Sequence, residues 1–177
     1  MLLGTLPATV PSAFAQDKTG FKKPKYSVKI KYLDDVMVNP NYVAPNIIIG
    51  GEMTRRGMVY LFASGFNKFI DLRADDERGA LPEEEFTKRA IDYIHIPITP
   101  ETLNIVQVHA FAKAIEDPTK GPFVVFDTTG ERAYGVWAVY LNQYRSVNRD
   151  RAIRDAEKFG LKSESLRKFI YQMMDGF

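Results

Sequence analysis

The fold of this chain is decided by the stretch Phe123-Val124-Val125-Phe126-Asp127-Thr128-Thr129-Gly130-Glu131-Arg132-Ala133. It begins as a short apolar run typical of a buried β-strand and breaks into a polar turn that contains a glycine. Apolar side chains then recur at spacings of three and four residues, which predicts a helix with one apolar face against a sheet. These side chains are Ala133, Val136, Trp137, Tyr140 and Tyr144. The polar turn should therefore lie at the N-terminus of a helix.

The turn between this strand and this helix is suited to binding an anion. Backbone N–H groups and the helix dipole favour an oxyanion such as phosphate there, and the guanidinium of Arg132 is placed to bind the same group. A second interpretation of the same residues remains open. Thr128 followed three residues later by Glu131 has the form of a capping box, which would make the turn an ordinary strand-to-helix junction.

The same turn resembles the signature loop of the small cysteine-dependent phosphatases of the dual-specificity type. The bacterial branch of that family carries the loop Cys-x-x-Gly-x-Arg, and Asp127-Thr128-Thr129-Gly130-Glu131-Arg132 stands in its place here. The glycine and the arginine match, whereas Asp127 replaces the nucleophilic cysteine and Phe126 replaces the histidine that usually precedes it. Three upstream segments also resemble that family, namely Gly51-Glu52-Met53, Gly65-Phe66-Asn67-Lys68-Phe69-Ile70-Asp71-Leu72-Arg73 and Ile96-Pro97-Ile98-Thr99. The resemblance covers roughly residues 40–160 and implies a phosphatase-like α/β fold.

The resemblance implies a mechanism that this chain lacks the residues to complete. In such phosphatases a thiolate attacks phosphorus, the loop N–H groups and the arginine stabilise the phosphoryl oxygens, and an aspartate protonates the leaving oxygen. The chain contains no cysteine. Asp75 and Asp76 stand where the related enzymes carry their acidic loop, although a solvated loop is the favoured explanation of this acidic run. We therefore expect no catalytic residue, with Asp75 and Asp76 as candidates for a relic acid.

The function depends most on Asp127. A carboxylate at the base of the turn would repel a phosphate dianion, at a cost of several kcal/mol in a partly desolvated site. We expect Asp127 to pair with Arg132 or to accept N–H groups of the turn, so that the chain fills the site with its own anion. Arg132 would then retain weak oxyanion binding at most. The alternative is Asp127 as a nucleophile, which would need a magnesium ion and further carboxylates to hold it.

A bound metal or another cofactor is not expected from the residue types. The two histidines of the chain are His95, on an expected strand, and His109, inside an expected helix. With only these two histidines, in these elements, ordinary core or surface roles are favoured over a zinc site.

The length of 177 residues and a hydrophobic content of 45% predict one domain with a full core. Residues 1–15 carry no charge and end in Ala13-Phe14-Ala15, an Ala-x-Ala pattern that predicts a signal peptide. The positive start and the long apolar run of a full signal peptide are missing, which indicates a truncated or misassigned start. We expect export to the periplasm or another extracytoplasmic compartment. The later sequence lacks the apolar run of about eighteen residues that a membrane span needs.

A basic arm at residues 16–38 precedes the phosphatase-like domain, which is expected to span 39–177. Segment 17–33 holds six lysines and one aspartate, a balance of +5, which leaves −3 for the rest of a chain of net charge +2. Apolar and polar residues alternate from Tyr26 to Leu33, which predicts an edge strand. Such an arm would meet an acidic protein partner or an anionic surface, or remain a solvated tail. Nucleic acid is not expected as a partner.

Strands alternate with helices along the rest of the chain, which predicts a mainly parallel sheet of four to five strands flanked by helices. The expected strands are 47–49, 68–72, 93–96 and 123–126. The expected helices are 54–64, 81–90, 101–116, the segment from the turn to about 145, 149–159 and 163–174. Residues 39–45 are rich in asparagine and proline and are expected to form turns.

The residues favour an exported, catalytically inactive phosphatase-like domain that acts as a binding or assembly subunit of a larger complex. The basic arm, spare aromatic side chains or the C-terminal helices would supply the surface for a protein partner or for self-assembly. The alternative function is hydrolysis of phosphate esters through Asp127 or a metal-activated water.

Overall fold

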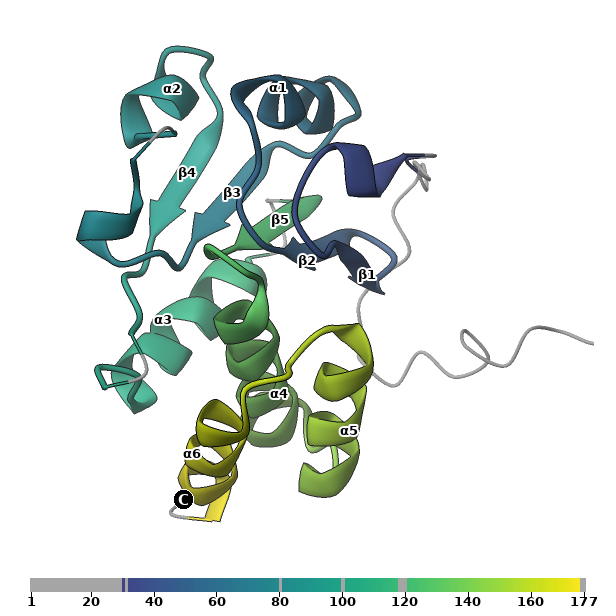
Figure 1. The fold of residues 1–177 in the computed structure, drawn as a ribbon, viewed down its shortest axis with the longest axis vertical. Helices are drawn as coiled ribbons and strands as arrows, with labels where there is room; N and C mark the ends of the chain where they lie inside the picture. Colours follow the sequence, from purple (N-terminus) through teal and green to yellow (C-terminus); the bar gives the residue numbers. More distant parts are fainter. Residues whose placement is uncertain (1–29, 31, 80, 100, 118–120, 176–177) are drawn as a thin grey trace, which may run out of the picture.

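The computed structural model describes residues 30, 32–79, 81–99, 101–117 and 121–175, which build a five-stranded sheet with helices on both faces (Figure 1). The strands are β1 (Asn41–Ala44), β2 (Ile47–Gly50), β3 (Lys68–Asp71), β4 (Asp92–His95) and β5 (Phe123–Phe126), in the order β1-β2-β5-β3-β4. β1 pairs antiparallel with β2, and the other pairs are parallel. The expected fold class, a mainly parallel sheet of four to five strands flanked by helices, is confirmed.

The two faces of the sheet carry different helices. The helices are η1 (Leu33–Asp35), α1 (Arg55–Ala63), η2 (Asp75–Glu77), α2 (Glu83–Thr87), α3 (Ile105–Ile115), α4 (Glu131–Arg145), α5 (Arg149–Phe159) and α6 (Glu164–Asp175). In Figure 1, α1 and α2 lie on one side of the sheet and α3 to α6 on the other. Within the described residues, no helix is long and apolar enough to cross a bilayer.

β5 is the central strand, and its side chains supply both cores. Val124 and Phe126 join the cluster beneath α1 and α2, whereas Phe123 and Val125 join the larger cluster beneath α3 to α6. This alternation follows from the period of two along a strand. A strand buried on both faces has no polar side, which explains its uninterrupted apolar sequence.

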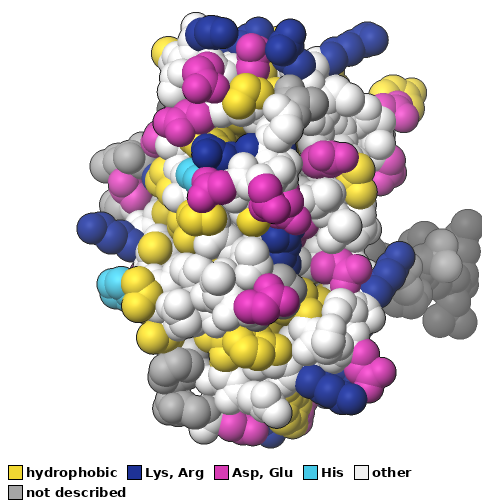
Figure 2. Space-filling model, turned by 60° about the vertical axis from the view of Figure 1, so that its left-hand side comes forward, with side chains coloured by type: hydrophobic (Ala, Val, Ile, Leu, Met, Phe, Trp, Pro, Cys, Tyr) yellow, Lys and Arg dark blue, Asp and Glu magenta, His cyan; other side chains and the backbone are white. Residues whose placement is uncertain are grey.

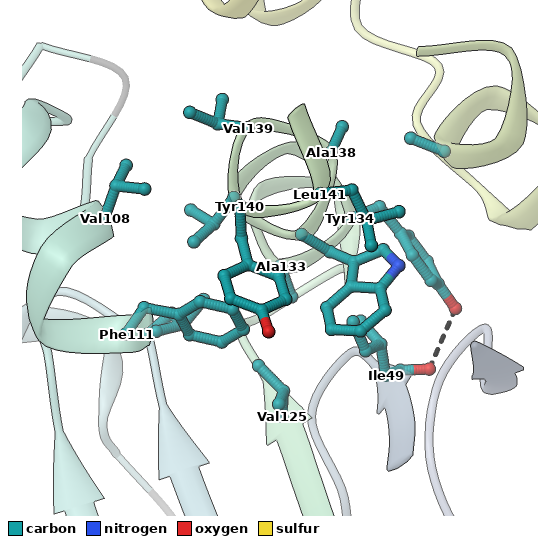
Figure 3. Packing of buried hydrophobic residues seen from close by; sticks show 14 of the residues in the cluster. Ile49, Val108, Phe111, Val125, Ala133, Tyr134, Ala138, Val139, Tyr140 and Leu141 are labelled. Atoms are coloured by element: carbon teal, nitrogen blue, oxygen red, sulfur yellow. Dashed lines mark hydrogen bonds between the residues drawn. The ribbon is translucent and has the colours of Figure 1, made fainter. Parts of the chain in front are cut away.

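α4 is the helix around which the larger core forms. The sequence predicted one apolar face, but every residue from Arg132 to Leu141 is buried. The helix packs against α3, α5 and α6 as well as against β2, so it has several buried faces. Figure 3 shows Phe111 of α3 meeting Tyr140 of α4 above Val125, with the two rings edge to face and their centroids 5.7 Å apart.

β1 was not predicted, because Asn39 to Pro45 were expected to form turns. Instead, Asn41–Ala44 pairs along the edge of β2, with an irregular register between Tyr42 and Ala44. An edge strand needs pairing on one side only, so prolines next to its ends are compatible with it. The prolines and asparagines therefore lie at or next to the ends of this strand, and they do not indicate that a strand is missing.

The start of the described chain also differs from the predicted edge strand at 26–33. Ile30 lies outside any strand, Tyr32 lies in a turn, and Leu33 begins the 3₁₀ helix η1; residues 26–29 and 31 lie outside the described residues. The Ile30 N–H donates to the Tyr42 hydroxyl at 3.1 Å rather than to a strand ladder.

Part of the segment assigned to the basic arm belongs to the core. Ile30, Val36 and Met37 are buried in the cluster beneath α1 and α2. The packed part of the chain therefore begins ahead of residue 39. The expected signal peptide at 1–15 lies outside the described residues.

Trp137 in α4 tests this account of the core, since 2% of its surface is exposed. Trp137→Ala should lower the free energy of unfolding by about 3–5 kcal/mol because it removes a large buried side chain. Chemical denaturation measures this loss. Val106→Ala is the control, because Val106 is 72% exposed and its removal should change stability little. A near-neutral Trp137→Ala would contradict the buried position of the residue.

Candidate functional site

The candidate site lies at the carboxyl ends of three parallel strands. Phe126 is in register with Gly50 of β2 and Asp71 of β3, so β5 leads into its turn where both neighbours also end. The turn then enters α4 at Gly130, whose φ of 92° lies in the left-handed region. A Cβ at Gly130 would stand 2.9 Å from the carbonyl carbon of Gly50. Glycine is therefore required here both by backbone conformation and by close approach.

Asp127 occupies the interior of this turn. Its Oδ1 accepts the N–H groups of Thr129 at 2.7 Å and Gly130 at 2.6 Å, and its Oδ2 accepts the N–H of Ala133 at 2.8 Å. The Asp127 side chain is fully buried. The aspartate therefore takes the N–H groups that a bound oxyanion would use.

The environment of Asp127 affects its ionisation in opposite directions. Burial raises the pKa of Asp127 above its usual value, whereas the N–H groups that it accepts and the charge of Arg132 act to lower it. Both oxygens accept hydrogen bonds, which is the geometry of an ionised carboxylate. The turn thus encloses the carboxyl group of Asp127 among its own N–H donors.

Arg132 binds a different carboxylate. Its Nη2 donates to Glu77 Oε2 at 2.7 Å and to Oε1 at 2.9 Å, and its Nη1 donates to the Ile98 carbonyl at 2.7 Å. The Nε of Arg132 lies 3.9 Å from Asp127 Oδ2, beyond hydrogen-bonding distance. Both arrangements expected for Asp127 are found: it accepts N–H groups of the turn, and its Oδ2 also forms an ion pair with Arg132.

Glu77 was missed by the sequence analysis, which singled out Asp75 and Asp76. The side chain of Asp75 is 75% exposed and pairs with Arg78 at 3.0 Å, while Asp76 is also exposed. η2 instead brings its third acidic residue, Glu77, over the turn. The run of acidic residues is apparent in the sequence. Which of its carboxylates reaches Arg132 depends on the geometry of the 3₁₀ helix.

A buried ion pair holds the loop that carries Glu77 in place. Arg73 is paired with Asp71 at 2.7 Å, and both side chains are almost fully buried. The same guanidinium donates to the carbonyl of Leu81 at 2.8 Å and to that of Arg78 at 3.4 Å. Arg73 therefore holds the chain just beyond Glu77.

The alternative interpretation of Thr128 and Glu131 as a capping box is wrong. The N-cap of α4 is Gly130, which has no side chain, and Asp127 satisfies the N–H groups instead. Glu131 points to the N-terminus of α6, where its Oε2 accepts the N–H groups of Lys162 at 3.0 Å and Ser163 at 2.5 Å. Thr128 accepts a hydrogen bond from Arg132 at 3.3 Å.

The two histidines lie in the expected elements and do not meet. The Nε2 of His95, at the end of β4, is 2.8 Å from the Arg73 carbonyl, and His109 of α3 is 3.1 Å from the Tyr144 hydroxyl. In the part of the chain that the structure describes, no group of three or more histidine, aspartate and glutamate residues is arranged to hold a metal ion.

The surface near the site carries charges of both signs. Figure 2 brings the side of α2 and β4 forward and shows acidic side chains interspersed with basic ones on the described part of this face. Asp75 and Asp76 of η2 are both exposed. A hydrogen bond from Thr99 and, more weakly, the charge of Arg132 lower the pKa of Glu101. An incoming phosphate would therefore meet carboxylates around Arg132.

Comparison with known protein families identifies the fold and its family. Residues 31–171 match the family described as DSP-PTPase phosphatase fused to NAD+ kinase. The chain belongs to this family. The phosphatase resemblance expected from the sequence is thereby confirmed.

Solved structures share the fold at low sequence identity. A DUF442 phosphatase-type protein from Shewanella putrefaciens CN-32 has a TM-score of 0.64 and 19% identity, over 79% of this chain and 93% of that one. Tk-PTP in its active form has a TM-score of 0.67 and 15% identity, over 78% of this chain and 98% of that one. TpbA of P. aeruginosa has a TM-score of 0.64 and 13% identity, over 79% of this chain and 85% of that one. No individually curated protein matches the chain.

The Arg132–Glu77 pair predicts a dependence of stability on pH. Burial acts to raise the pKa of Glu77, but hydrogen bonds from Ala74 and Arg132 outweigh it and hold the pKa below its ordinary value of 4.5. A lowered pKa in the folded state stabilises the fold above the unfolded value, and this stabilisation is lost as pH falls through the folded value. Glu77→Gln should therefore cost about 1–2 kcal/mol at pH 7 and much less near pH 3.

Urea unfolding of both proteins at the two pH values measures this difference. Asp76→Asn is the matched control because it removes the same charge from an exposed residue of η2, and it should change stability by less than about 0.5 kcal/mol. An equal cost of Glu77→Gln at both pH values would show that its carboxylate does not stabilise the fold through Arg132.

Proposed function

We propose that this chain is a catalytically inactive phosphatase-like domain that serves as a binding or assembly subunit. The observation that carries the proposal is the position of Asp127, whose carboxylate accepts three N–H groups from the turn. These are the groups that would stabilise a phosphoryl oxygen in an active enzyme. A domain that keeps this fold without that capacity is expected to act through its surface.

Phosphate binding would have to displace an internal ligand. Asp127 is joined to the turn by a chain of only a few atoms, so its carboxylate has a very high effective concentration at the N–H groups. A free phosphate dianion would also meet the negative charge of Asp127 in a site shielded from water. Both effects oppose binding of a substrate at the turn.

The chain offers no evident nucleophile at this position. It contains no cysteine, so a phosphocysteine intermediate cannot form. Asp127 is poorly placed to act in its stead, because both of its oxygens accept hydrogen bonds and its side chain is fully buried. In-line attack on phosphorus would require the carboxylate to leave the N–H groups that hold it.

The solved structures share the fold of this chain, but this likeness does not assign their activity to it. TpbA, which is 13% identical to this chain, has been crystallised in complex with phosphotyrosine. This fold therefore holds a phosphate monoester in that protein. At such low identity the likeness extends to the fold, and activity depends on the residues of the site.

We place this binding domain outside the cytoplasm as part of the same proposal. Support comes from the Ala13-Phe14-Ala15 cleavage pattern, and the lysine-rich segment 17–33 would supply a basic surface for an acidic protein partner. Isolation of intact complexes from the native source tests both points. A partner recovered from an extracytoplasmic fraction supports the proposal, and a lone cytoplasmic monomer contradicts it.

Turnover of a generic aryl phosphate tests catalytic inactivity. The purified wild-type chain should show no hydrolysis above the buffer blank, either with or without added magnesium. Hydrolysis that requires magnesium and is lost in Asp127→Asn would establish the alternative hydrolase and overturn the proposal.

Vanadate binding measures whether Asp127 fills the site. Wild type should bind vanadate weakly or not at all, whereas Asp127→Ala frees three N–H groups and should bind it about tenfold more tightly or better. Asp127→Ser repeats the test with a smaller loss of volume and hydrogen bonding. Isothermal titration gives the dissociation constants, and thermal unfolding confirms that each variant is folded.

The same titrations include a negative control. Arg132→Ala should abolish the binding gained in the Asp127 variants, because it removes the guanidinium from the site. Tight vanadate binding by wild type, unchanged in Asp127→Ala, would show that Asp127 does not block the site. Asp127→Cys is expected to bring some hydrolysis, since the helix N-terminus and Arg132 would favour a thiolate.

A further inference from the structure

Helix α1 is apolar on both of its sides. Met58 and Leu61 are buried in the core, whereas Val59, Tyr60 and Phe62 are 40%, 45% and 36% exposed. These three side chains form one arc, called here the outer face of α1, because successive residues of a helix are about 100° apart. Six large hydrophobic side chains are exposed among the described residues, and half of them belong to this face. A helix that is apolar all round is normally covered all round.

The described chain begins beside this face. Ile30 is buried in the cluster beneath α1, and its N–H donates to the hydroxyl of Tyr42 at 3.1 Å. The ring of Tyr42 packs against Phe66, just after α1, with the centroids 6.4 Å apart. Burial raises the pKa of Tyr42, and the neighbouring Tyr60 raises it further. Tyr60 of the outer face is therefore close to the point at which the chain enters the core.

The first described residues already pack against α1. Val36 and Met37 join Ile30 in the cluster beneath the helix. A Cβ at Gly57 would collide with the carbonyl oxygen of Val36, so the backbone passes directly against the start of α1. In Figure 1 the purple stretch that contains η1 lies beside α1. The residues that precede Ile30 thus continue from a stretch that packs on this helix.

We propose that segment 26–29 of this chain packs on the outer face of α1 through Tyr26 and Val28. Side chains of an extended segment alternate between two sides, so Tyr26 and Val28 share the side of Ile30, which is buried. The four residue steps from Tyr26 to Ile30 span about 13 Å when extended. The nine residues of α1 also span about 13 Å, so the segment is long enough to cover the face.

The charges of the segment fit this orientation. Lys25 and Lys29 alternate with the apolar residues, so they face water when Tyr26 and Val28 face α1. The opposite orientation would bring these lysines toward the exposed Arg55 and Arg56 at the start of α1, where like charges repel. The docked segment would also give a fixed position to the basic surface that the proposed function assigns to an acidic partner.

This docking is a feature of the N-terminal segment of this chain and goes beyond the proposed function. The match to the family begins at residue 31, after the segment. α1 and α4 lie on opposite sides of the sheet, so the docking does not depend on the turn that holds Asp127 (Figure 1).

Limited digestion of the full chain with trypsin tests the docking. Cleavage after Lys25 or Lys29 requires the segment to leave α1, so its rate follows the undocked fraction. Tyr60→Ser combined with Phe62→Ser should raise that rate about tenfold, because apolar contacts of the segment are lost. Val106→Ser is the control, since it removes an exposed apolar side chain from α3 and should leave the rate unchanged. Thermal unfolding confirms that each variant is folded.

Engineered disulfides locate the segment, because the chain contains no cysteine of its own. Val28→Cys is combined in turn with Val59→Cys, Tyr60→Cys and Phe62→Cys, and each protein is oxidised in air. At least one pair should form a disulfide within one chain, which requires the two Cα atoms to approach within about 7 Å. Val28→Cys combined with Val106→Cys should form none.

Two results would overturn the inference. One is a cleavage rate that Tyr60→Ser with Phe62→Ser leaves unchanged, and the other is the absence of any disulfide between the segment and α1 of the same chain. Disulfides that form only between two copies would assign the outer face of α1 to a second chain instead. Each of these results would leave the vanadate tests of Asp127 unaffected.

Discussion

The hydrogen bonds from three backbone N–H groups to the carboxylate of Asp127 are the constraint on which this site depends. The first N–H groups of a helix have no partner within the helix, and here those of Gly130 and Ala133 are buried at the carboxyl ends of parallel strands. Gly130 has no side chain to cap α4, yet a side chain larger than hydrogen would collide with Gly50. A group from the strand side must therefore serve, and Asp127 is that group. A phosphate-binding turn leaves the same task to its ligand.

While Asp127 accepts the N–H groups of the turn, Arg132 makes structural contacts. Through Glu77 and the carbonyl of Ile98, Arg132 joins α4 to the loop after β3 and to the loop after β4. Glu131 acts in the same way toward the start of α6. Residues that match or border a phosphatase signature thus tie together the loops around the carboxyl end of the sheet.

The sequence predicted the parts of the fold that follow from periodicity. The strand at 123–126, Gly130 at the turn and Thr54 as the cap of α1 were all readable, because each depends on its immediate neighbours. The sequence did not indicate that α4 is buried on several faces. That property depends on α5 and α6 folding back over it, which is a tertiary arrangement rather than a local pattern.

The sequence likewise predicted only the part of the candidate site that depends on neighbouring residues. Asp127 at the base of the turn was expected to satisfy N–H groups because a carboxylate at a helix N-terminus has few better partners. Glu77 could not be chosen from the run Asp75-Asp76-Glu77 by residue type, since all three are carboxylates close to the same strand end. Their separation comes from the 3₁₀ turn, which directs one carboxylate to Arg132 and leaves Asp75 to pair with Arg78.

A turn whose donors are already satisfied within the protein is stable without a ligand. Catalysis needs donors that gain more from the transition state than from the resting protein. In this chain the N–H groups of Thr129, Gly130 and Ala133 reach their partner before any ligand arrives. The interaction energy of these three hydrogen bonds contributes to the folded state. The phosphatase-like fold of this chain therefore contains, within the turn itself, a partner for the N–H groups of the turn.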